Sequence, residues 1–163
     1  MTATQMMALS VLDISSGNNI GAITGFLIDG DLKAIVALEI GGGWFSHPHY
    51  LPYASINAID NDVVTISSPE VLVQRGDFKM ARLISSLSGR KVYTEEGKNL
   101  GTVHEYDIAN DNGEINSITV ALDTFALGIL LRSEGKSFEI PRKLISVFGD
   151  SVVVDNSISM NGE

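Results

Sequence analysis

The sequence contains the same pattern of apolar, Gly and Pro residues twice, and this repeat limits the possible folds most. Ile20-Gly21-x-Ile23 recurs as Leu100-Gly101-x-Val103, 80 residues later, and Leu51-Pro52 recurs as Ile140-Pro141, 89 residues later. Between these two motifs we align residues 32–37 with residues 115–120, which are 83 positions later. The increase from 80 to 83 predicts a longer hairpin tip in the second copy. Matched positions whose spacing drifts only in loops indicate two copies of one domain.

Each copy consists of short apolar segments separated by turn residues. In the first copy we expect strands over 20–28 and 32–40 around Asp29-Gly30-Asp31, because an Asp-Gly pair favours a tight hairpin. The stretch Ile35-Val36-Ala37-Leu38 is apolar on both sides, so we expect it to be covered on both faces. Many short strands without a helical pattern predict a small closed barrel. The predicted fold is therefore all-β, with two tandem barrels over residues 6–74 and 89–156.

The segment between the copies, residues 75–88, is predicted to be a linker with a short helix. Apolar residues from Phe78 to Leu87 follow helical spacing, which places the helix there. The two ends, Met1 to Gln5 and Asn156 to Glu163, are predicted to be frayed.

Composition excludes several classes of function. The net charge is −9 and both copies are acidic, which argues against direct contact with nucleic acid, since phosphates require clustered Lys and Arg. The nearest basic group is Lys79, Arg82, Arg90 and Lys91, which we interpret as a solvated face of the linker. No apolar run approaches the roughly 20 residues of a transmembrane helix, and no signal pattern opens the chain. The absence of cysteine fits a reducing cytosol, so we expect a cytoplasmic protein.

The order of motifs in each copy resembles the PRC-barrel family. The segments that carry the resemblance best are 87–92, 96–101 and Ile140-Pro141 followed by 145–150. That family includes the cytoplasmic part of the photosynthetic reaction centre H subunit, a ribosomal small-subunit maturation factor, and free-standing prokaryotic proteins with one or two barrels. The free-standing tandem type is the most similar in organisation. The family offers no catalytic residues and no cofactor to carry over to this chain.

The resemblance implies a non-enzymatic adaptor that binds and assembles proteins. Its partner would be a protein complex. That complex could lie at the inner face of a membrane, with the chain associated peripherally. Homo-oligomerisation is left open. The alternative is an accessory factor in ribosome assembly or RNA processing that acts through contacts with ribosomal proteins.

The two copies differ most in the loop after the central hairpin, which makes this loop the candidate binding site. It carries large apolar side chains that would suit a protein partner, namely Trp44, Phe45 and Tyr50 in the first copy and Phe125, Leu127, Ile129 and Leu130 in the second. Loops on a rigid scaffold commonly carry specificity, and exposed aromatic residues are typical hot spots. The alternative is that these side chains fill their own barrel or pack one barrel against the other.

His47 and His49 are weak candidates for a metal site. Two histidines at i and i+2 of an extended segment lie on one face, but a metal requires three or four ligands. The one remaining histidine, His104, belongs to the other copy. We therefore predict structural or solvated histidines, with no metal and no cofactor. The run Gly41-Gly42-Gly43 leads into a His-Pro turn instead of a helix, so it does not predict a phosphate site.

Overall fold

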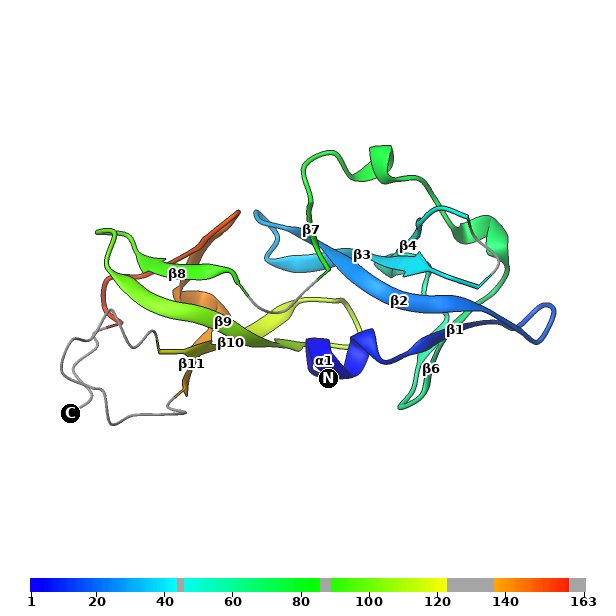
Figure 1. The fold of residues 1–163 in the computed structure, drawn as a ribbon, viewed down its shortest axis with the longest axis horizontal. Helices are drawn as coiled ribbons and strands as arrows, with labels where there is room; N and C mark the ends of the chain where they lie inside the picture. Colours follow the sequence, from blue (N-terminus) through cyan, green and yellow to red (C-terminus); the bar gives the residue numbers. More distant parts are fainter. Residues whose placement is uncertain (44–45, 86–88, 123–136, 159–163) are drawn as a thin grey trace.

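The computed structural model describes residues 1–43, 46–85, 89–122 and 137–158, and its regular structure is mostly β with very little helix. Two curled sheets lie end to end along the long axis of the molecule (Figure 1). The strands are β1 Ser10–Asp13, β2 Asn18–Asp29, β3 Ala34–Gly41, β4 His49–Pro52, β5 Ala58–Ile59, β6 Val63–Ile66, β7 Arg82–Ile84, β8 Lys91–Thr94, β9 Asn99–Ile108, β10 Ile115–Ala121, β11 Ser137–Pro141, β12 Ile145–Phe148 and β13 Val152–Val154. The short helices are α1 Ala3–Met7 and the 3-10 turns η1 Tyr53–Ser55, η2 Pro69–Val71, η3 Arg75–Phe78 and η4 Arg142–Leu144.

The two sheets have the same topology, which confirms the predicted duplication. The strand order is β4-β3-β2-β1-β6-β5 in the first sheet and β11-β10-β9-β8-β13-β12 in the second. The one parallel pairing, between β1 and β6, recurs between β8 and β13. The turns η1 and η4 each follow the proline of the repeated motif, Pro52 or Pro141. The chain is thus built from two equivalent barrel-like repeats in tandem.

The register of the hairpins corrects one part of the sequence alignment. Ile28 pairs with Ile35 in the first repeat, and Ile108 pairs with Ile115 in the second. Both hairpin tips therefore have the same length, and the spacing remains 80, so the predicted spacing of 83 and the longer second tip are wrong. The apolar pattern of β3 continues on both faces, so the sequence does not show which of its residues face the core.

The expectation that β3 is covered on both faces is confirmed. Ile35 and Leu38 lie in the main core. On the other face, Ala37 belongs to a second apolar cluster, and residues of the chain between the repeats cover this cluster. We call this segment, residues 74–85, the connector.

The connector contains less helix than predicted. A helical element is present, but it is the short η3 at Arg75–Phe78, and the predicted helix over Phe78 to Leu87 is wrong. Arg82–Ile84 instead forms β7, which pairs antiparallel with β2 at Phe26–Ile28. This end of β2 extends beyond the β1 pairing, so its free backbone groups require a partner, and β7 supplies one.

The first residues of the chain form the equivalent pairing on the other sheet. Thr2 forms a bridge with Asp107 of β9, and the Ile108 N–H donates to the Met1 carbonyl at 2.8 Å. Thr2 and Gln5 then cap α1 reciprocally, and α1 buries Ala3 and Met6. The predicted fraying of Met1 to Gln5 is wrong because these residues are paired, capped and packed. Each repeat therefore lends its leading segment to the sheet of the other repeat.

The hairpin tips of the two repeats also bond to each other reciprocally. The Ile35 N–H donates to the Gly113 carbonyl at 2.7 Å, and the Ile115 N–H donates to the Lys33 carbonyl at 3.0 Å. Lys33 and Gly113 occupy equivalent positions, and both have a positive φ, 50° and 75°. A Cβ at Gly113 would lie 2.6 Å from the Ile35 carbonyl oxygen, so this close approach requires glycine. The contacts relate the repeats by an approximate two-fold axis.

A single apolar core runs through both repeats. Its members include Val11 and Val64 from the first sheet and Val92 and Val152 from the second. At the junction the equivalent aromatic rings of Phe26 and Tyr106 meet edge to face, with centroids 5.9 Å apart. The two repeats therefore form one packed body.

Candidate functional site

The structure places one of the predicted binding residues and leaves the others outside its scope. Trp44, Phe45, Phe125, Leu127, Ile129 and Leu130 lie outside the described residues. Tyr50 lies on β4, and it is only 7% exposed. It belongs to the second apolar cluster, together with Ala81 of the connector. For Tyr50 the observed position favours the alternative that the side chain packs within the protein.

Tyr50 belongs to a small polar group on the outer face of the first sheet, in which Tyr50 and Glu39 are buried. Its hydroxyl donates to Glu39 Oε2 at 3.0 Å, and the Thr24 hydroxyl donates to Glu39 Oε1 at 2.7 Å. Burial, followed by the hydrogen bond to Glu39, raises the pKa of Tyr50. Both carboxylate oxygens of Glu39 accept hydrogen bonds, so this group satisfies itself and holds β4 against β2 and β3.

The histidines form local contacts. His47 is exposed, and its Nε2 lies 3.3 Å from the Ser46 hydroxyl. His49 begins β4, and its Nδ1 lies 3.0 Å from the His47 carbonyl oxygen. In the part of the chain that the structure describes, no three His, Cys, Asp or Glu side chains are grouped as a metal site would require. Within its described ranges, the structure thus adds no third ligand of these residue types to His47 and His49.

The connector is shaped by Arg75. Its Nη1 donates to the Phe78 carbonyl at 2.5 Å, and its Nη2 donates to the Ala81 carbonyl at 2.7 Å. A planar guanidinium with several donors suits such a double contact. The side chain of Arg75 thereby closes residues 75–81 into a compact loop over the first sheet.

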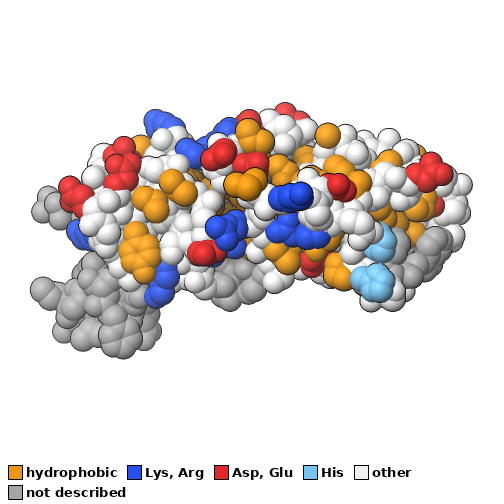
Figure 2. Space-filling view, turned by 90° about the horizontal axis from the view of Figure 1, so that it is seen from above, with side chains coloured by type: hydrophobic (Ala, Val, Ile, Leu, Met, Phe, Trp, Pro, Cys, Tyr) orange, Lys and Arg blue, Asp and Glu red, His pale blue; other side chains and the backbone are white. Residues whose placement is uncertain are grey.

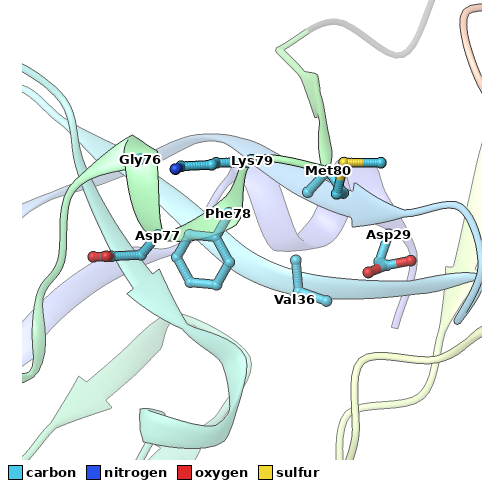
Figure 3. A pocket seen from close by; sticks show the side chains of 8 residues that line it. Asp29, Val36, Gly76, Asp77, Phe78, Lys79 and Met80 are labelled. Carbon is cyan, nitrogen blue, oxygen red and sulfur yellow. The ribbon is translucent and has the colours of Figure 1, made fainter.

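A hollow of about 500 Å³ lies between this loop and the sheet. Phe78 points down toward β3, where Val36 lies, and Met80 and Asp29 lie at the other end of the hollow (Figure 3). Asp77 and Lys79 project from the loop. Phe78 and Val36 pack on the second apolar cluster, so the hollow has an apolar floor and charged edges.

A second hollow, of similar volume, lies on the side of the connector that faces the second repeat. We call it the connector groove, and it is lined by Arg75, Lys79, Met80, Ala81, Arg82, Leu83, Arg90 and Asp150. Figure 2 looks onto this side of the molecule, and Lys and Arg side chains gather near its middle with hydrophobic side chains beside them. Of the described residues that line the groove, four are Lys or Arg and one, Asp150, is acidic.

Most of the arginines in the connector groove donate to backbone carbonyls. Arg90 donates to the carbonyls of Gly149 and Leu83, and Arg75 to those in its own loop. Within the described ranges, Arg82 is the one groove arginine that meets a carboxylate, that of Asp150, at 3.1 Å. Backbone carbonyls fix the guanidinium groups without cancelling their charge, so the groove keeps a local positive charge on an acidic protein.

The basic group was visible in the sequence, but its setting was not. From the sequence alone we interpret Lys79, Arg82, Arg90 and Lys91 as a solvated face, and we do not single out Arg75. The signal that could have revealed the connector groove lies in a comparison of the repeats. In the first sheet, three residues of the outer face are apolar, namely Leu27, Val36 and Ala37. The equivalent residues of the second sheet are polar, namely Asp107, Asn116 and Ser117. The connector covers this apolar face of the first sheet.

None of the helices in the described ranges is both long and apolar enough to cross a membrane. In comparisons with known proteins, the family model described as the PRC-barrel domain matches the chain twice, over residues 1–73 and over residues 80–160. None of the curated proteins matches the chain. The two matches cover both repeats and leave residues 74–79, the first half of the connector, outside either repeat.

Proposed function

Because the chain belongs to the PRC-barrel family and carries two of its domains, we propose that it is a non-enzymatic adaptor that binds and assembles proteins. The observation that carries this proposal is the junction between the repeats. Reciprocal hydrogen bonds at the hairpin tips and one continuous core hold the two barrels in a fixed orientation. A rigid body with two joined domains can present several surfaces in a defined geometry, which is what an assembly platform requires.

The proposal places the adaptor in the cytoplasm, as the cysteine-free sequence suggests. Its partner is a protein or a protein complex. The buried carboxylate of Glu39 is used internally, since it accepts from both Tyr50 and Thr24. This arrangement supports a structural role for the carboxylate.

The proposal is tested by chemical cross-linking in cells of the source organism, with the tagged full-length chain as bait and mass spectrometry as readout. We expect a complex of constant stoichiometry that survives gel filtration, with cross-links that recur on one face of the chain. A chain that elutes alone and yields only scattered cross-links would contradict an adaptor role. Recurrent cross-links to ribosomal proteins would assign it to ribosome assembly instead.

A further inference from the structure

We propose that the connector groove binds an acidic peptide segment of a protein partner, one that carries apolar side chains among its carboxylates. This inference rests on the proposed adaptor function and assigns it a surface. The groove lies at the boundary between the connector and the second repeat. It is formed by residues 75–83 of the connector together with Arg90 and Asp150 of the second repeat. Residues 74–79 lie between the two family matches and have no counterpart in the other repeat. The two-fold relation between the barrels therefore does not generate a second copy of the groove.

The charge of the connector groove also favours an acidic ligand. The chain has a net charge of −9, yet Arg75, Lys79, Arg82 and Arg90 line one groove. Among the described residues, Asp150 is the one carboxylate that lines it, and it lies beside Arg82. A positive groove on a negative body attracts a short acidic segment and orients it as it approaches.

Two of the four cations in the groove are held in place before any partner binds. The guanidinium groups of Arg75 and Arg90 are each fixed by two backbone carbonyls. Groups that are already ordered lose less conformational entropy on binding. The guanidinium also suits carboxylates, because its planar donors can contact both oxygens of the group.

The groove also exposes apolar side chains among these charges. Met80 is 85% exposed and Leu83 is 38% exposed, and both line the groove. Methionine is flexible and polarizable, and it adapts to differently shaped apolar side chains. The combination of exposed apolar surface and fixed cations fits a peptide with both acidic and apolar residues.

The same observations favour a peptide over an extended polyanion. Nucleic acid and anionic membranes present many charges over a long path or a plane, and both require a broad basic surface. Here four cations gather in one short groove, and Asp29 and Asp77 lie on the other side of the connector. A longer polyanion would meet these carboxylates.

The test uses the full-length chain immobilised on a resin and a labelled pool of peptides with random order of Asp, Glu, Leu and Phe. The control pool replaces Asp and Glu by Asn and Gln. We expect selective retention of the acidic pool, with release as the salt concentration rises. The retained peptides are then sequenced, and their affinity for the chain is measured by fluorescence anisotropy.

Two matched double variants assign the site. Lys79→Glu/Arg82→Glu should weaken binding by about tenfold or more, because each change replaces an attraction by a repulsion. Lys98→Glu/Lys143→Glu changes the net charge equally at exposed positions of the second repeat, and it should leave the affinity unchanged. Met80→Ser should weaken binding several-fold without changing the salt dependence. The melting temperature of each variant verifies that it is folded.

Three outcomes would overturn the assignment. One is equal retention of both pools, and another is equal loss of affinity in the two double variants. The third is binding of phosphatidylserine vesicles or oligouridine in preference to the acidic peptides. Each of these leaves the adaptor function intact if cross-links in cells still recur on another face. Loss of recurrent cross-links altogether would instead remove the adaptor function itself.

Discussion

Tyr106 lies where the two repeats meet, and its hydroxyl is buried without a hydrogen-bond partner among the described residues. Its ring packs between Phe26 and Phe148. A buried polar group without a partner is destabilising, and its removal without a change of shape removes that cost. The equivalent position in the first repeat is Phe26, so a phenylalanine ring is compatible with this fold.

We therefore expect Tyr106→Phe to raise the free energy of unfolding by about 1 kcal/mol, measured by urea denaturation. The matched control is Tyr53→Phe, which removes a hydroxyl that donates to the Asn110 carbonyl at 3.0 Å. This control should lower the free energy of unfolding, because it removes a hydrogen bond between the repeats. A destabilised Tyr106→Phe protein would contradict the prediction.

The same tyrosines predict how stability depends on alkaline pH. Burial raises the pKa of Tyr53 and of Tyr106 from 10.0 to about 12. In the unfolded chain these phenols lose their protons near pH 10, before they do so in the folded protein. Stability should therefore be unaffected below pH 10 and fall as the pH rises from 10 to 12.

For Tyr106 the loss of stability on the alkaline side should reach about 2–3 kcal/mol. The measurement is the free energy of unfolding across this pH range for the unmodified chain and for Tyr106→Phe. The variant should show a shallower decline. Identical profiles would mean that Tyr106 ionises alike in both states.

At the scale of elements, the sequence was sufficient where the pattern was local and insufficient where partners were distant. The hairpins around Asp29-Gly30 and the Pro52 and Pro141 motifs were found because turn residues and apolar spacing mark them. β7 was missed because Arg82-Leu83-Ile84 is a strand only when it pairs with the free edge of β2. Helical spacing from Phe78 onward was a local signal, and tertiary pairing overrode it.

The connector loop should depend on Arg75. Replacement by alanine removes two charge-assisted hydrogen bonds to the carbonyls of Phe78 and Ala81. Such bonds contribute about 1.5–3 kcal/mol each. We expect Arg75→Ala to increase local opening, and with it the rate of tryptic cleavage after Lys79, by about tenfold or more. Limited proteolysis followed by mass spectrometry measures this rate.

Arg142→Ala is the matched control for this prediction. Arg142 also donates to a backbone carbonyl, that of Leu32, at 2.8 Å, but it lies away from the connector. Cleavage after Lys79 should be unchanged in this variant. Equal rates in Arg75→Ala and the unmodified chain would show that packing of Phe78 alone holds the loop.

At the scale of the whole molecule, the exchange of leading segments explains what the sequence could and could not reveal. The repeat predicted two similar barrels, and the structure confirms them. The relation between the barrels was not predictable, because it depends on a pairing between Thr2 and Asp107 that no local pattern encodes. The candidate site was predictable only in part. Comparison of the repeats could show which sheet the connector covers, but the connector groove also requires Arg90 and Asp150 to lie beside residues 75–83.

The shared core leads to a prediction about cooperativity. Val64 in β6 and Val152 in β13 are equivalent positions, and both are fully buried in the same cluster. Val64→Ala and Val152→Ala each remove the same two methyl groups, at a cost of about 2 kcal/mol. If the repeats unfold as one unit, each variant should lower one shared melting transition by about 5 °C, as measured by calorimetry.

Hydrogen exchange then shows whether the loss is shared. In either variant, protection should fall in the most protected strands of both repeats, because each of them opens only when the whole core opens. Independent barrels would behave differently. Val64→Ala would then leave the hydrogen-exchange protection of β8 to β13 unchanged, and the calorimetric melting curve would split into two transitions. That outcome would also remove the fixed geometry on which the adaptor role depends, since barrels that melt separately are not held as one body by their junction.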